Sequence, residues 1–201
     1  MAAGAVLAFW AVALVLIAVP GADWAFTIAA GLRGHSVLPA VGGLVTGYAV
    51  VTVAVAAGVG ALVAGSPRAL AAVTLAGGAY LVWHGATTLL RPAKPRVVAV
   101  GPGWRTFWRG VGVSGLNPKA LLMFLALLPQ FTDPRGSWPV AGQLAVLGLT
   151  FTLTCGAFYA VLGSVARGVL HARPAVARAV SRCAGAAMVV IGATLLLAQL
   201  R

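Results

Sequence analysis

The sequence has 201 residues, of which 61% are hydrophobic and only 8% are charged, and its mean hydropathy is +1.02. Soluble domains carry roughly 25% charged residues, so this composition excludes an ordinary soluble domain and predicts a protein whose main solvent is lipid. The net charge of +12 does not indicate a nucleic-acid binder, because the basic residues occupy short gaps between long apolar runs.

Six apolar segments are long enough to cross a bilayer, which takes about 20 residues. They extend over about 4–31, 36–64, 69–90, 107–131, 139–166 and 178–200. The first segment lacks the basic start of a signal peptide and continues past any cleavage point, so we interpret it as a retained span. The sequence therefore predicts one all-α integral membrane domain over residues 1–201.

Basic residues are divided unequally between the two sides of this predicted bundle. One side carries Arg68, Arg135 and Arg201. The other side carries ten basic residues, namely Arg33, Arg91, Lys94, Arg96, Arg105, Arg109, Arg167, Arg173, Arg178 and Arg182. The positive-inside rule makes the richer side cytoplasmic, which places both termini outside and the protein in the plasma (inner) membrane.

An internal repeat is visible when the sequence is shifted by 107 residues. GAYLVWHGATTLL from Gly78 then aligns with GAAMVVIGATLLL from Gly185. This predicts repeat A at about 4–90, a cytoplasmic basic loop at about 91–106, and repeat B at about 107–200. Three spans per copy force the copies into opposite orientations, the 3+3 inverted repeat of many secondary transporters. The alternative is convergence of two segments rich in Ala, Gly and Leu.

The first and fourth predicted helices each contain a proline inside the apolar stretch. Pro20 and Gly21 should break helix 1, because proline removes a backbone donor and clashes with the preceding turn. Asn117 is a favoured N-cap and Pro118 a favoured first residue, so a half-helix should begin there. Matched interruptions in the two halves indicate a transporter's midplane binding site, although ordinary proline kinks are the alternative.

A charged residue follows each predicted interruption. Asp23 and Lys119 each lie ten residues from a cytoplasmic anchor, Arg33 or Arg109, which puts both about 15 Å deep in a core of about 30 Å. An ionised side chain there costs at least roughly 2.5 to 3.5 kcal/mol, so each needs a partner or a task. Two hypotheses stay open: a direct Lys119–Asp23 ion pair, or a zwitterionic substrate inserted between the two.

The motifs resemble those of the LysE/RhtB family of amino-acid exporters along nearly the whole chain. VPGAD from Val19 resembles the family's PGPD-like motif, GAYLVWHGATTLL its third-span signature, and GLNPKALLMFLALLPQF from Gly115 its NPK and P-Q-F motifs. The resemblance implies proton-driven export of amino acids or related metabolites. It also marks the expected functional positions as Pro20, Gly21, Asp23, Asn117, Pro118 and Lys119. Ala22 stands where the family commonly has a second proline, so we expect a gentler kink and a substrate other than lysine, threonine or homoserine.

Four further polar residues are candidates for lining a cavity in this bundle: Tyr48, His84, Gln130 and Gln143. His84 could relay protons, because imidazole titrates near neutral pH, but a packing role explains it as well. Tyr80 and Tyr159 could line it as well, and interhelical hydrogen bonding or interfacial anchoring is the alternative for the tyrosines and Gln143. Gly43-x-x-x-Gly47 allows close helix approach, either inside the protomer or across a homodimer.

No cofactor, metal site or enzymatic activity is predicted, and two other transport functions remain as alternatives. A membrane thiol-disulfide electron carrier would use Cys155 and Cys183, but these residues are in the fifth and sixth spans, away from the predicted breaks. A metal-ion exporter would need several oxygen or imidazole ligands, and the spans offer one Asp and one His.

Overall fold

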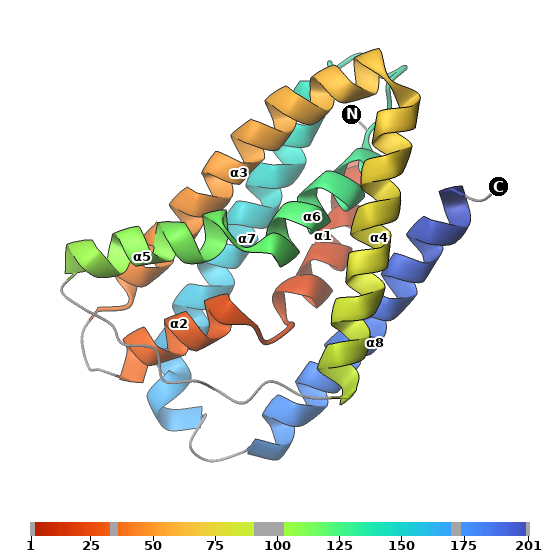
Figure 1. The fold of residues 1–201 in the computed structure, drawn as a ribbon. Coiled ribbons are helices and arrows are strands. Elements are labelled where there is room, and N and C mark those ends of the chain that lie inside the picture. The colour runs from red at the N-terminus through yellow and green to blue at the C-terminus, as the bar shows by residue number, and fades with distance from the viewer. Residues whose placement is uncertain (1–2, 33–35, 91–102, 170–173, 200–201) are drawn as a thin grey trace.

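The computed structural model describes residues 3–32, 36–90, 103–169 and 174–199, and these residues form helices and contain no strand (Figure 1). The elements are α1 (Ala3–Ile17), α2 (Ala22–Leu32), α3 (Leu38–Gly65), α4 (Pro67–Leu90), α5 (Gly103–Gly115), α6 (Pro118–Leu127), the short 3₁₀ helix η1 (Leu128–Phe131), α7 (Val140–Val169) and α8 (Pro174–Gln199). The prediction of an all-helical protein is confirmed. The basic loop expected at about 91–106 lies outside the described residues as far as position 102.

Two helices are, by length and composition, able to cross a membrane on their own. They are Leu38–Gly58 within α3 and Val140–Ala166 within α7. The pair α1 and α2 meets the same condition if it is counted as one bent span. Over the described residues no other helix meets it, so the six spans stay a prediction.

The chain between α1 and α2 is not helical, and the two helices are bent by 64° relative to each other. The last turn of α1 tightens, since the Val19 amide donates to the carbonyl of Leu16 at 3.2 Å. The carbonyl of Gly21 accepts the first bond of α2, from the Ala25 amide at 3.0 Å. The indole of Trp24 donates to the Ile17 carbonyl at 2.9 Å, which satisfies one of the acceptors left at the end of α1.

A second interruption separates α5 from α6. The Asn117 amide donates to the Ser114 carbonyl at 3.2 Å, a tighter turn than the α-helical bond before it, from Leu116 to Gly112. The carbonyl of Asn117 then accepts the first bond of α6, from the Leu121 amide at 3.0 Å. Asn117 is therefore the N-cap of α6, and Pro118 is its first residue.

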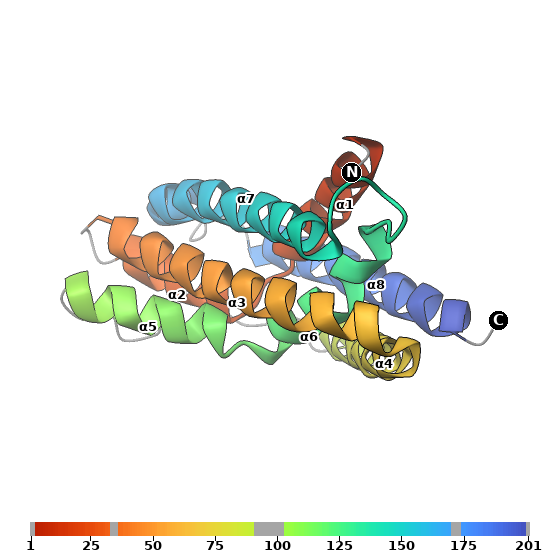
Figure 2. The ribbon, with the colours of Figure 1, turned by 90° about the horizontal axis from the view of Figure 1, so that it is seen from above.

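Helices α4 and α8 pack antiparallel with their backbones in contact (Figures 1 and 2). A Cβ atom on Gly85 would lie 2.7 Å from the carbonyl oxygen of Gly185, and one on Gly192 would lie 2.7 Å from that of Gly78. Each helix thus presents two glycines to the other, about two turns apart. Such small residues let membrane helices approach closely.

Helices α3 and α7 also run side by side, as both views of the ribbon show. Val45 lies 3.0 Å from where a Cβ of Gly156 would be, and the side chain of Thr52 occupies the same place at Gly148. Helices α3 and α7 are therefore antiparallel, as α4 and α8 are.

The G-x-x-x-G motif of α3 packs against α5. A Cβ on Gly43 would collide with the Phe107 carbonyl oxygen, and one on Gly47 would collide with the Ser114 hydroxyl. That hydroxyl donates to the Leu44 carbonyl at 2.9 Å, which ties the two helices together. The motif therefore serves an interface inside the protomer, and a homodimer stays a prediction.

Candidate functional site

Asp23 is the acidic side chain in the interior of the described bundle. It lies in the first turn of α2, directly after the interruption, and only 6% of its surface is exposed. A carboxylate in this position interacts favourably with the positive end of the helix dipole. Because a buried charge is costly unless it is hydrogen-bonded, its surroundings decide what it can do.

Three residues from three other parts of the chain surround this carboxylate. The Tyr48 hydroxyl, from α3, donates to Asp23 Oδ2 at 2.6 Å. The Asn117 side-chain amide donates to the same oxygen at 3.4 Å. The hydroxyl of Tyr159, from α7, is within interaction range of both Asp23 and Tyr48. The carboxylate therefore joins the two interruptions, α2 on one side and the start of α6 on the other.

The start of α6 supplies the other half of the site. Pro118 has no backbone donor, and the Leu121 amide is bonded to the Asn117 carbonyl, so the amides of Lys119 and Ala120 come before the first hydrogen bond of α6. Helix N-termini of this kind attract carboxylate groups. The side chains of Pro118 and Lys119 lie outside the described part of the structure, so the expected Lys119–Asp23 pair stays a prediction.

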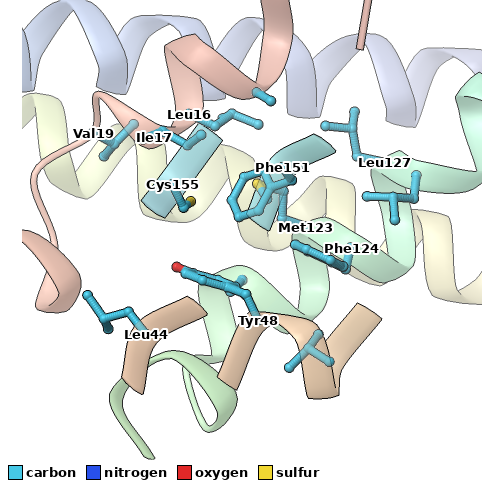
Figure 3. Close-up of a cluster of buried hydrophobic side chains, with 14 of the residues drawn as sticks. Leu16, Ile17, Val19, Leu44, Tyr48, Met123, Phe124, Leu127, Phe151 and Cys155 are labelled. Carbon is cyan, nitrogen blue, oxygen red and sulfur yellow. The ribbon is translucent and has the colours of Figure 1, made fainter. Parts of the chain in front are cut away.

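An aromatic cluster fixes the ring of Tyr48. The ring stacks on Phe124, with 6.3 Å between centroids, and meets the edge of Phe151 at 5.2 Å. Phe124 and Phe151 contact each other at 5.0 Å. Figure 3 shows Tyr48 reaching from α3 into this cluster, with Met123 and Phe124 beside its ring. The position of the hydroxyl is thus set by packing, as precise recognition requires.

A small cavity lies against the carboxylate. It is lined by Leu16, Ile17, Asp23, Tyr48, Asn117, Ala120, Met123, Phe151 and Tyr159. Its volume is about 10 Å³, which is room for about one water and too small for an amino acid.

The structure places the sequence-predicted residues in different parts of the protein. Asp23, Asn117 and Tyr48 meet at the cavity, and Pro20 and Gly21 form the chain between α1 and α2 that leads to it.

The other three candidates for lining the cavity are elsewhere. Gln143 is fully buried, but its amide donates to the Asp133 and Trp138 carbonyls, both at 2.8 Å, and its oxygen accepts from the Asp133 amide, so it holds the loop before α7. His84 stacks on Tyr80 within α4, and Gln130 is exposed in η1. None of these three residues lines this cavity.

Sequence reasoning gave Tyr159 as a residue that could line a cavity, but it did not select the apolar lining residues. Tyr159 is buried, and the signal that points to it is a tyrosine hydroxyl inside an apolar span. Cys155, one turn earlier on α7, is within interaction range of Tyr48 and Tyr159, so it lies closer to the site than its place in the sequence suggests. Cys183 is exposed on α8, and neither thiol forms a disulfide within the described residues.

Apolar helices around a buried acid at two interruptions are typical of a membrane transport protein. The chain belongs to the LysE type translocator family, whose family model matches residues 14–199. It is 36% identical over 159 residues to an uncharacterized membrane protein of Vibrio cholerae, an alignment that covers 72% of each chain.

Two relatives carry functional names. A homoserine/homoserine lactone efflux protein of Salmonella typhimurium is 32% identical over 60% of this chain and 58% of its own length. A leucine efflux protein of Enterobacter is 30% identical over 64% of this chain and 65% of its own. The chain thus spans about three-fifths of these two efflux proteins. No solved structure matches it.

Proposed function

We propose that this protein exports amino acids across the plasma membrane and that the substrate binds between the interruptions at 18–21 and 116–117. The observation that carries this proposal is the bond network in which the buried Asp23 carboxylate meets Asn117, the N-cap of α6. Irregular backbone at membrane depth is tolerated where it lines a site or a watery cavity. The efflux functions named for two relatives agree with it.

In this proposal each end of a zwitterion has its own partner. The substrate ammonium binds Asp23, and the substrate carboxylate binds the N-terminus of α6 together with Lys119. Pro20, Gly21, Asn117 and Pro118 hold the two helix ends at the geometry that this requires. The cavity has room for about one water, so its walls must move apart before substrate can enter.

The spans follow the 3+3 inverted plan, with helices 1 and 4 interrupted and both termini outside. The packing of α4 on α8 supports this arrangement. The 107-residue shift relates Gly78 to Gly185 and Gly85 to Gly192, yet Gly78 packs on Gly192 and Gly85 on Gly185. Such reciprocal contacts arise when a two-fold axis crosses the interface. In an antiparallel pair, that axis runs across the helices, as an inverted repeat requires.

Asp23 also carries the coupling proton in this proposal. On the cytoplasmic side an ionised Asp23 takes up the substrate ammonium, which removes the cost of carrying an uncompensated charge through the bilayer. On the outer side a proton displaces the substrate from the carboxylate, and the protonated site returns to release the proton inside. Export is thereby driven by proton entry, and neither crossing leaves the carboxylate both charged and unpaired.

The test uses purified protein in liposomes with an imposed proton gradient. Asp23→Asn keeps the size of the side chain and its hydrogen bonding, but it can neither pair with an ammonium nor bind a proton reversibly. We expect it to abolish gradient-driven amino-acid transport while the protein inserts and melts like wild type. Asp133→Asn is the matched control, since the control carboxylate is exposed in a loop. Normal transport by Asp23→Asn would rule the proposal out.

A further inference from the structure

The wall of the cavity has a polar part and an apolar part. Four of the lining residues offer polar atoms: Asp23, Tyr48, Asn117 and Tyr159. The other five offer only carbon and one thioether sulfur: Leu16, Ile17, Ala120, Met123 and Phe151. The polar atoms are gathered around one carboxylate, where Tyr48 and Asn117 share an oxygen of Asp23. A ligand with one polar end and one apolar end would match both parts of this wall.

We infer that the substrates are neutral amino acids with aliphatic side chains of about the size of leucine or methionine. The inference rests on the proposed function, in which Asp23 takes the α-ammonium group. The side chain of the substrate then faces the five apolar residues. Met123 and Leu16 are almost fully buried, and Met123 can adapt to different aliphatic shapes because its side chain is flexible.

A basic substrate side chain has no second carboxylate to pair with in this cavity. The chain contains two acidic residues in all, and the second is Asp133. Asp133 is exposed in the loop before α7, where its side chain accepts the Arg135 amide at 2.9 Å. A lysine-type substrate would place its second ammonium against the apolar wall without a carboxylate, an arrangement that strongly disfavours binding.

A hydroxyl side chain is disfavoured for a related reason. Homoserine would bring a group that gives up its bonds to water, and the five apolar residues have no side-chain donor or strong acceptor to replace them. The polar side chains of the site are grouped at Asp23, where the α-ammonium is bound. The apolar wall therefore favours substrates whose side chains carry neither a hydroxyl group nor a charge.

Transport by the wild-type protein in liposomes tests this substrate class directly. Burial of each additional methylene should raise kcat/KM roughly fourfold, so leucine should exceed alanine by on the order of 50-fold. We expect leucine and methionine to exceed lysine and homoserine. A preference for lysine or homoserine would overturn this inference while leaving the proposed export function in place. If no amino acid is transported, the proposed function itself fails.

A variant of the apolar wall gives an independent measurement. Met123→Ala should reduce the preference for leucine over alanine by roughly fourfold or more, because the substrate side chain loses part of its packing surface. Met188→Ala is the matched control, since Met188 is equally buried but lies on α8 outside the cavity. An unchanged preference in Met123→Ala would overturn the inference. If this variant does not fold, the wild-type substrate ranking decides alone.

Discussion

The hydroxyl of Tyr48 donates to the Asp23 carboxylate at 2.6 Å, and its removal tests whether the network is functional. Tyr48→Phe deletes this one oxygen and keeps the ring between Phe124 and Phe151. A carboxylate can accept about four hydrogen bonds, so a substrate ammonium can bind while Tyr48 still donates. The hydroxyl therefore orients the carboxylate, and its loss should weaken transport.

The size of the effect follows from the type of bond. A hydrogen bond to a charged group contributes about 1.5 to 3 kcal/mol. With tenfold per 1.36 kcal/mol, kcat/KM for leucine should fall roughly 10- to 150-fold in Tyr48→Phe. Tyr80→Phe is the matched control, because Tyr80 stacks on His84 within α4 and does not line the cavity. Its transport should equal that of the wild type.

A double-mutant cycle shows whether the two groups act together. Leucine binding should be measured for Asp23→Asn, for Tyr48→Phe and for the double variant by isothermal titration in detergent. Coupling means that Tyr48→Phe costs less when it is combined with Asp23→Asn than when it is made in the wild type. Wild-type binding by Tyr48→Phe, or losses that simply add, would refute the role given to this hydroxyl.

Three further predictions concern packing and access. Gly43→Ala should lower the melting temperature in detergent by several degrees, because the added Cβ collides with the α5 backbone. Gly58→Ala is the control, since a Cβ there meets open space and the variant should melt like wild type. Equal melting temperatures of the two variants would contradict this packing. Gln143→Ala should also lower the melting temperature, since three hydrogen bonds worth about 1 kcal/mol each are lost. An unchanged melting temperature would contradict the role of Gln143 in holding the loop before α7. In a Cys183→Ser background, leucine should slow labelling of Cys155 by a membrane-permeant maleimide, and labelling at the same rate with and without leucine would place the substrate elsewhere.

The two interruptions show what sequence patterns can predict. Proline removes a backbone donor wherever it stands, so Pro20 and Pro118 predict breaks in their helices, and that these prolines cause the interruptions stays a prediction. Asn117 as an N-cap follows from equally local chemistry, and the structure shows it in that position. Such features depend only on neighbours along the chain.

Residues from distant helices could not be predicted in the same way. The apolar helices lack a polar face that would set their rotation, so Met123 and Phe151 resemble any other lipid-facing or core residue in the sequence. Gln143 could, from the sequence, either line a cavity or form a hydrogen bond between helices. Its partner is the backbone of the preceding loop, which becomes visible only when the chain is folded.

The account depends on an amino acid binding with its ammonium at Asp23, and a structure determined with bound leucine tests this most directly. We expect the leucine nitrogen at a hydrogen-bonding distance of about 2.7 to 3.2 Å from the Asp23 carboxylate, with the leucine carboxylate at the start of α6. Leucine bound away from Asp23, or bound with its carboxylate toward that residue, would contradict the account.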